Sequence, residues 1–272
     1  ITKIATALLV LETAQPEEPV RIDPRAVGVE GSAIWLEAGE VLTVEELLYG
    51  LLLESGNDAA TALAIHIAGE VDAFAQLLTS RIRQSGAVKT VFRNPHGLPM
   101  PEHVVTALEM AVIAAEAMEN PLFRKIVATH THRIPWPGRP WDRWLENHNR
   151  ALGRSGIDGI KTGYTRSARH TFVASATRSG RRLIAVLLRS PSRDAKFREA
   201  EELLNTAFAS YRWVLPTGEN LPDAVPVTGG RERAVPVVTA LPPIPLKADG
   251  SEQVTVEYQL PAAVPAPVTA GQ

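Results

Sequence analysis

The sequence contains no cysteine and carries almost no net charge. Its 272 residues include 28 Lys and Arg against 30 Asp and Glu, which leaves a charge of −2. Disulfides and thiolate metal sites are therefore excluded, although an oxidising compartment also tolerates a chain without cysteine. A nearly neutral chain lacks the basic surface typical of nucleic-acid binding, so we expect no nucleic acid partner. No apolar run reaches the roughly 18 residues that a membrane span needs.

The chain has the composition of a globular protein, and this composition changes near residue 215. With 45% hydrophobic residues, the chain is long enough for one large or two modest domains. Helical patterns dominate the first part, whereas residues 216–272 are rich in Pro, Val and Gly and contain alternating runs such as QVTVEYQL. Such runs are typical of short strands interrupted by proline. We therefore expect a main domain over residues 1–215 and a partial, β-rich C-terminal domain over residues 216–272.

The main domain contains several clear helix signals. Thr43 with Glu46, and Thr106 with Glu109, have the spacing of capping boxes. In a capping box, the side chain of each residue accepts a hydrogen bond from the backbone N–H of the other. Gly69 is a typical residue just beyond a helix C-terminus. The pattern predicts helices within the ranges 43–55, 57–69, 71–86 and 106–120.

The hydrophobic period changes towards the end of this domain. The run TFVASATRSGRRLIAVLLRS predicts two strands joined at Ser179 and Gly180, which is a strong hairpin signal. A charged amphipathic helix is expected to follow over residues 193–208. Helices with a hairpin at the end indicate the α+β class, with an antiparallel sheet covered by helices.

Three short stretches could carry chemistry: Lys3, the segment Ser55-Gly56-Asn57, and the segment Lys161-Thr162-Gly163. Each has an ordinary structural role when it is taken alone. A Lys-Thr-Gly segment is common in solvated turns, and Ser-Gly-Asn suits the end of one helix and the start of the next, with Asn57 as the N-cap.

Together and in this order, the three stretches resemble the signatures of penicillin-recognising serine acyltransferases, the first of which is Ser-x-x-Lys. The blocks TKIATALLVLE, GSAIWLEAGEVLTVEELLYGLLLESGNDAATALA, FRNPHGL, NHNRAL and GIKTGYT extend this resemblance from Ile1 to about Tyr211. The chain is similar to the low-molecular-mass penicillin-binding proteins of the serine D-alanyl-D-alanine carboxypeptidase (peptidase S11-like) family. The resemblance implies a β-lactamase/transpeptidase-like fold with a helical subdomain, and a small C-terminal all-β domain.

The same resemblance implies the reaction and the base. Such enzymes remove the terminal D-Ala from peptidoglycan stem peptides through an acyl-serine intermediate, and β-lactams acylate them. Lys3 matches the lysine of the first signature, so the nucleophilic serine is expected immediately before Ile1. A spacing of three residues places two side chains on one helix face. A lysine serves as base when burial and positive neighbours lower its pKa.

The other site residues are also carried over from the resemblance. Ser55 is expected to relay the proton to the leaving amine, and Asn57 to orient the lysine and bind the substrate amide. Lys161 and Thr162 suit the free carboxylate at the end of a D-Ala-D-Ala peptide. Their neighbours Gly163 and Tyr164 are expected to let the substrate lie against the strand and to supply an oxyanion-hole N–H group, respectively.

Two other classes of function remain open from the sequence. A class A β-lactamase shares the three signatures, but typically has Ser-Asp-Asn as the second and needs a glutamate for deacylation. A non-catalytic peptidoglycan-binding or scaffold protein is the other alternative, because the 272 residues contain no serine at the first-signature position.

Two residues depart from the family pattern, and two groups of ring side chains could have further roles. Arg169 stands where the family usually has glycine, and Lys196 where we expect arginine. His130 and His132 alternate on an extended segment, but no third ligand stands at a recognisable spacing, so no metal or cofactor is expected. The tryptophans of the loop over residues 135–146 suit either packing under the loop or a wall for the glycan or peptide part of the substrate.

We expect the natural protein to be longer at both ends and to act in the periplasm or outside the cytoplasm. Family members often end in an amphipathic helix that anchors them to the membrane. Membrane association is therefore expected only through a C-terminal segment beyond residue 272. The expected partners are stem peptides ending in D-Ala-D-Ala and β-lactam antibiotics.

Overall fold

The computed structural model of the chain describes residues 1–214, 222–237, 243–254 and 259–268. The chain divides into two compact units, Ile1–Asn205 and Thr206–Gln272. The domain boundary expected near residue 215 lies outside the described residues, as do residues 255–258 of the run that we expected to form a strand.

The first unit contains a helical part built around one buried helix, α1 (Lys3–Thr13), whose residues 3–10 are all buried. Helix α1 contacts five other helices, so its apolar side chains form the centre of the core. These helices are α2 (Val44–Leu52), α3 (Asn57–Ala68), α4 (Val71–Gln84), α5 (Ala107–Ala117) and α6 (Pro121–Val127).

The helix ends follow the sequence signals in part. The Thr43–Glu46 capping box is complete, since the Thr43 side chain accepts from the Glu46 N–H and the Glu46 carboxylate accepts from the Thr43 N–H. Thr106 caps α5, but the Glu109 carboxylate accepts hydrogen bonds from Lys89 N–H and Thr90 Oγ1 instead of reaching back. Half of the second capping box is therefore replaced by tertiary contacts.

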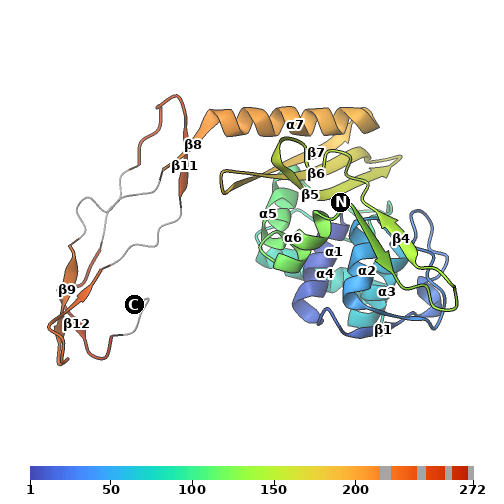
Figure 1. The fold of residues 1–272 in the computed structure, drawn as a ribbon, viewed down its shortest axis with the longest axis horizontal. Helices are drawn as coiled ribbons and strands as arrows, with labels where there is room; N and C mark the ends of the chain where they lie inside the picture. The colour runs from blue at the N-terminus through green and yellow to red at the C-terminus, as the bar shows by residue number, and fades with distance from the viewer. Residues whose placement is uncertain (215–221, 238–242, 255–258, 269–272) are drawn as a thin grey trace. The chain divides into compact units, whose positions relative to one another are not determined.

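An antiparallel sheet covers the helical part. It has the order β5–β6–β7, with β5 (Ile157–Thr165), β6 (Arg169–Arg178) and β7 (Arg181–Ser190). Strands β6 and β7 form the hairpin expected at residues 179 and 180. In Figure 1, α5 and α6 lie against one face of this sheet and α7 (Arg193–Ser210) lies on the other, where Phe197 packs edge-on against Phe172. This arrangement is the α+β, transpeptidase-like architecture that the sequence predicts.

Two small hairpins were not predicted. Strands β1 (Pro19–Arg21) and β2 (Val41–Thr43) pair beside the short helix η1 (Pro24–Ala26), and β3 (Thr131–Ile134) pairs with β4 (Arg143–Glu146). The expected tryptophan-containing loop therefore includes the turn and second strand of the β3–β4 hairpin. A further short helix, η2 (Arg154–Gly156), precedes β5.

The second unit contains short strands in its described residues. Strand β8 (Tyr211–Val214) pairs with β11 (Ile244–Lys247), while β9 (Ala224–Thr228) lies between β10 (Ala234–Pro236) and β12 (Val264–Pro265). Across the described part of the chain, no single helix has the length and apolarity to cross a membrane. Helices α3 and α4 meet those criteria only as a pair, and they are bent by 83° with respect to each other.

Candidate active site

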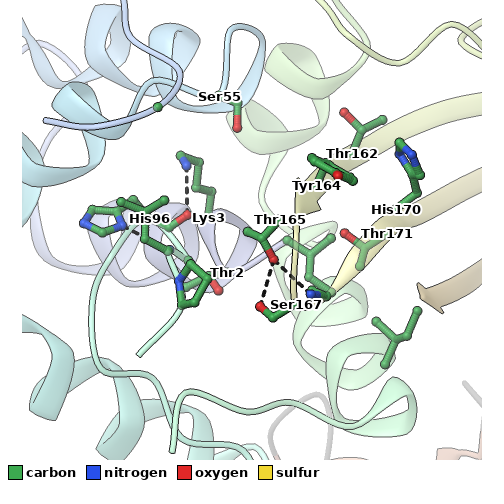
Figure 2. A pocket seen from close by; sticks show the side chains of 18 of the residues that line it. Thr2, Lys3, Ser55, His96, Thr162, Tyr164, Thr165, Ser167, His170 and Thr171 are labelled. Carbon is green, nitrogen blue, oxygen red and sulfur yellow. Dashed lines mark hydrogen bonds between the residues drawn. The ribbon is translucent and has the colours of Figure 1, made fainter. Parts of the chain in front are cut away.

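The three signature stretches meet at one cavity of about 840 Å³. Figure 2 shows Lys3 approaching this cavity from α1, Ser55 from the loop before α3, and Thr162 from strand β5. The residues expected from the sequence that line the cavity are Lys3, Ser55, Asn57, Thr162, Gly163 and Tyr164. Residues from three stretches that lie far apart in the sequence therefore share one site.

Lys3 is the most constrained side chain of the site. It is 4% exposed, and its ammonium donates hydrogen bonds to Asn57 Oδ1 at 2.6 Å and to the His96 carbonyl oxygen at 2.8 Å. Burial lowers the pKa of Lys3 well below its usual value, and the nearby charge of Lys161 lowers it further, while Asp58 opposes the shift. A buried amine with a lowered pKa can accept a proton near neutral pH.

Asn57 orients this lysine rather than capping a helix. Gly56 is the N-cap of α3, so the prediction of Asn57 as the N-cap was wrong. The Asn57 side chain lies between two partners, because its Oδ1 accepts from Lys3 and its Nδ2 donates to the Glu30 carbonyl at 2.5 Å. A Cβ atom on Gly31 would lie 2.7 Å from Nδ2, so a glycine at this position gives the amide room.

Ser55 lies above Lys3 with its hydroxyl facing the cavity in Figure 2. Its backbone has a φ of 65°, a left-handed conformation that is uncommon for residues other than glycine. The strained conformation turns the chain sharply between α2 and α3 and directs the short side chain into the site.

Lys161 does not line the cavity but is buried behind its wall on strand β5. Only 2% of the residue is exposed. Burial, followed by the charge of Lys196, lowers the pKa of Lys161 to about 7, and Glu54 acts in the opposite direction. Its charge is the second cause, after burial, of the lowered pKa of Lys3.

The part of strand β5 that follows Lys161 is closely packed. A Cβ atom on Gly163 would lie 2.6 Å from Thr171 Oγ1 and 3.1 Å from the Ile1 nitrogen, so no larger residue fits without movement. Tyr164 is 62% exposed and packs against the His170 ring, with the ring centroids 4.6 Å apart. Gly163 and Tyr164 both line the cavity, so this part of strand β5 forms one of its walls.

Positive charge surrounds the point where the chain enters the site. The pKa of the Ile1 α-amino group is lowered to about 4 by burial and then by Lys161, Lys3 and Lys196. Burial disfavours a charge of either sign, whereas the positive charges of the three lysines favour an anionic group. The arrangement therefore suits a substrate carboxylate or a developing oxyanion.

The sequence reasoning gave no role to several residues that line the cavity. Lys196 is one of them, and burial followed by the charge of Arg193 lowers its pKa to about 8. The family resemblance marks position 196 as one where arginine is expected, but the pattern of α7 assigns the lysine no role, because charged residues recur throughout that helix. The other unassigned lining residues with ionisable side chains are His96, His103, His148, His170, Arg189 and Arg193.

His103 links the site to a neighbouring loop. The Arg93 N–H donates to Nδ1 of His103 at 3.1 Å, so Nε2 is the protonated nitrogen and donates to Thr2 Oγ1 at 2.9 Å. Burial is the main cause that lowers the pKa of His103 to about 4. The imidazole therefore stays neutral near pH 7 and holds Thr2, the residue before Lys3.

Other residues singled out from the sequence lie elsewhere. Arg169 is exposed at the start of β6 and pairs with Thr165, outside the cavity lining. His132 stacks on Tyr49, with centroids 3.6 Å apart, and the His130 carbonyl accepts from Asn147 N–H. Among the residues that the structure describes, no three His, Asp or Glu side chains gather as metal ligands.

An antiparallel sheet over a helical part, with a lysine-rich groove between them, defines the transpeptidase-like class of fold. The chain belongs to the peptidase S11 family, whose model is described as D-alanyl-D-alanine carboxypeptidase and matches residues 1–192. It is 31% identical to the D-alanyl-D-alanine carboxypeptidase DacF of Bacillus subtilis over all of this chain and 72% of DacF. It is 35% identical to DacB2 of Mycobacterium tuberculosis, over 68% of this chain and 64% of DacB2.

Solved structures agree with this assignment. The DD-transpeptidase of Streptomyces K15 matches with a TM-score of 0.72 and 31% identity, over 76% of this chain and 86% of the transpeptidase. A D-alanyl-D-alanine carboxypeptidase from Mycobacterium tuberculosis matches with a TM-score of 0.71 and 32% identity, over 76% of this chain and 80% of that chain. Among the other relatives, the chain spans 58% of DacC and 45% of DacA, both from Escherichia coli.

Proposed function

We propose that the whole protein is a serine D-alanyl-D-alanine carboxypeptidase that removes the terminal D-Ala from peptidoglycan stem peptides. The observation that carries this proposal is the environment of Lys3, a buried amine with a lowered pKa that faces Asn57 and lies within the field of Lys161. Family membership supports the same reaction. β-Lactams, which resemble the end of the substrate, are expected to acylate the same serine.

The proposed acylation begins at a serine immediately before Ile1. The neutral amine of Lys3 accepts the proton of the serine hydroxyl as its oxygen forms a bond to the carbonyl carbon of the penultimate D-Ala. Ser55 then relays this proton from the Lys3 ammonium to the amine of the terminal D-Ala as the peptide bond breaks, so Lys3 is neutral again and Ser55 keeps its hydroxyl. Water then cleaves the acyl-serine ester, which releases the shortened peptide and restores the serine hydroxyl.

The same proposal assigns the substrate carboxylate to the positive side of the site. Thr162 supplies a hydroxyl on the cavity wall, while Lys161 and Lys196 supply charge. The oxyanion is expected to accept from the backbone N–H groups of Tyr164 and of the serine. The position of the serine next to the N-terminus of α1 adds the favourable end of the helix dipole.

The test is labelling with a fluorescent penicillin of three forms of the protein. The first is the 272-residue chain, the second carries an added serine before Ile1, and the third carries an added alanine. We expect stoichiometric labelling of the serine form alone, and no labelling when Lys161→Ala is introduced into it. Equal labelling of the alanine form would refute the placement of the nucleophile.

Substrate turnover distinguishes the remaining alternatives. We expect the serine form to release D-Ala from a stem pentapeptide, and the 272-residue chain without the added serine to release none. Rapid, repeated hydrolysis of a chromogenic cephalosporin by the serine form would favour a β-lactamase instead. Peptide binding without D-Ala release by the natural full-length protein would favour the scaffold function.

We further propose that the protein acts outside the cytoplasm and associates with the membrane, where peptidoglycan is accessible. Residues 1–215 would form the catalytic domain and residues 216–272 part of a β-rich second domain. Limited proteolysis followed by mass spectrometry tests this division, which predicts a protected fragment ending near residue 215.

A further inference from the structure

A loop over residues 91–104 forms part of the wall of the active-site cavity. Its two ends are joined, because the N–H group of each of Val91 and Val104 donates to the carbonyl oxygen of the other at 3.0 Å. Within the loop, Asn94 Oδ1 accepts from the Gly97 N–H group at 2.6 Å. The loop is therefore closed at its ends and braced from inside, which makes it a fixed support for the elements that it contacts.

Two carbonyl oxygens of this loop accept hydrogen bonds from helix α1. Lys3 Nζ donates to the His96 oxygen at 2.8 Å (Figure 2). One turn further along the helix, Thr6 Oγ1 donates to the Pro95 oxygen at 2.6 Å. Both acceptors are main-chain atoms, so these contacts depend on the path of the loop and not on its side chains.

A third contact between the loop and α1 is made by a side chain. His103 Nε2 donates to Thr2 Oγ1 at 2.9 Å. The backbone of Thr2 is already helical, with a φ of −47° and a ψ of −36°, and its hydroxyl makes no capping hydrogen bond within the described part of the chain. A threonine at a helix start commonly caps the helix with this hydroxyl. In this chain the hydroxyl bonds to His103 instead, and a Cβ atom on Gly97 would lie only 2.8 Å from it.

The His103 ring is itself held in place by its surroundings. Its Nδ1 accepts from the Arg93 N–H group at 3.1 Å. The ring also packs against the buried Phe92 ring, with the ring centroids 5.5 Å apart. Arg93 and Glu102 form an ion pair beside it. The imidazole therefore has one orientation, in which both of its nitrogen atoms are bonded, and it passes the position of the loop on to Thr2.

Thr2 occupies a sensitive place in the proposed mechanism. It lies between Lys3 and the serine that is expected immediately before Ile1, and all of these residues fall within about one turn of helix. A shift of residue 2 would therefore change the distance between the nucleophile and its base. A displacement of about 1 Å in such a geometry can cost about 100-fold in rate.

We propose that His103 is a positioning residue, which fixes the start of α1 through Thr2 and so sets the distance between the nucleophilic serine and Lys3. This role needs no contact between His103 and the substrate. The proposal deepens the carboxypeptidase function and rests on it for the serine. Its structural part, that His103 stabilises the first turn of α1, needs no catalysis, so the 272-residue chain is sufficient to test that part.

The first test measures amide hydrogen exchange in the 272-residue chain. The N–H groups of Ile4 and Thr6 donate to the carbonyl oxygens of Ile1 and Thr2, so their exchange reports the opening of the first turn of α1. We expect exchange about fivefold faster in Thr2→Val and in His103→Asn, because each removes one neutral hydrogen bond. Unchanged exchange in both variants would overturn the proposal. Equal acceleration in strand β6 would indicate a general loss of stability and would overturn it too.

The second test separates penicillin binding from acylation in the serine form. Stopped-flow labelling over a range of penicillin concentrations gives the dissociation constant of the first complex and the acylation rate constant separately. We expect Thr2→Val and His103→Asn each to lower the rate constant about tenfold and to change the dissociation constant by less than about twofold. The double variant should be no slower than either single variant, since both remove the same contact. Thr2→Ser keeps a hydroxyl and His103→Gln an N–H donor, so both should retain most of the rate.

A matched control is His66→Asn, which removes a partly buried histidine that bonds to Glu18 outside the cavity lining. It should leave both the exchange at the start of α1 and the acylation rate unchanged. Additive losses in the double variant, or a loss confined to the dissociation constant, would overturn the proposal. A wild-type serine form that penicillin does not label would instead refute the proposed function, while the exchange test would still decide whether His103 holds α1.

Discussion

The ammonium nitrogen of Lys3 lies 2.6 Å from Oδ1 of Asn57, and both residues are almost completely buried. The two residues are the first residues of two different helices, α1 and α3. The amide of Asn57 is held on its other side by the Glu30 carbonyl. This contact fixes the direction of the lysine and stabilises its charged form without adding a negative charge beside it.

The first prediction concerns the charge at residue 57. Asn57→Asp places a carboxylate against Lys3, which raises the pKa of the lysine and reduces the neutral fraction that acts as base. We expect the rate of penicillin acylation in the serine form to fall at pH 7 and to recover at higher pH. Asn57→Ala removes a hydrogen bond to a charged group, worth about 1.5–3 kcal/mol, so acylation should fall about 10- to 100-fold at every pH. Stopped-flow labelling from pH 6 to 10 measures both effects.

A suitable control is Asn120→Ala, which removes the N-cap of α6 away from the cavity. It should cost about 1 kcal/mol of stability and leave the acylation profile unchanged. A pH profile for Asn57→Asp identical to that of the wild type would contradict the role of Asn57 at the lysine.

The second prediction links the buried Lys161 to stability. Its pKa is about 7 in the folded protein and near 10.4 in an unfolded chain. Between these values the unfolded state binds more protons, so the free energy of unfolding rises with pH, by at most about 1.4 kcal/mol per pH unit for this group. Urea unfolding from pH 7 to 9 should show a shallower rise for Lys161→Met than for the wild type.

Lys3 and Lys196 titrate in both proteins, but loss of the Lys161 charge also raises the pKa of Lys3 towards its ordinary value. Both changes make the slope of the variant shallower. Lys125→Met is the matched control, since the Lys125 side chain is 64% exposed and pairs with Glu45. It should retain the wild-type slope. An unchanged slope in Lys161→Met would show that the buried lysine does not titrate in this range.

The third prediction concerns the close approach at Gly163. Gly163→Ala places a methyl group 2.6 Å from Thr171 Oγ1, and such overpacking costs about 1–3 kcal/mol. We expect reduced stability and slower acylation in the serine form. Adding Thr171→Ala should relieve the steric conflict and restore stability, while acylation stays slow because the methyl group still lies at the cavity wall. Recovery of both properties would show that only packing requires the glycine.

The fourth prediction concerns the buried pair of Arg143 and Glu40. Arg143→Met leaves the Glu40 carboxylate buried without its cation, and breaking such a pair typically costs about 3–5 kcal/mol. The double variant with Glu40→Gln should recover part of this loss. Arg25→Met removes an arginine from a largely exposed cluster and should cost about 1 kcal/mol or less. Equal losses in the two single variants, measured by urea unfolding, would contradict this ranking.

The sequence predicts those parts of the fold that local physics determines. The hairpin at residues 179 and 180 and the cap at Thr43 depend on neighbours within a few positions, and both are present. Glu109 depends on a tertiary partner, because Lys89 and Thr90 compete for its carboxylate. The contacts of Glu109 therefore could not be predicted from the spacing alone.

The candidate site could also be predicted from the sequence only in part. Motif order locates Lys3 and Asn57 but does not reveal that Lys161 lies behind the cavity wall, since the depth of a side chain depends on the packing of the whole sheet. The β3–β4 hairpin was missed because its strands have four residues each and are separated by a proline-rich turn. Arg143 gave no signal either, because its meaning comes from Glu40, about 100 residues earlier in the chain.

The contacts of Asp58 with the preceding loop tolerate substitutions in that loop but not changes in its length. Its carboxylate accepts from the N–H groups of Ile34 and Leu36, and its neighbour Asn57 holds Lys3. A substitution at position 35 leaves both of these backbone contacts in place, whereas an insertion or deletion shifts them and disturbs the base through the shared helix start. The outer surface can therefore diversify by point mutation, while the length of this loop is tied to catalysis.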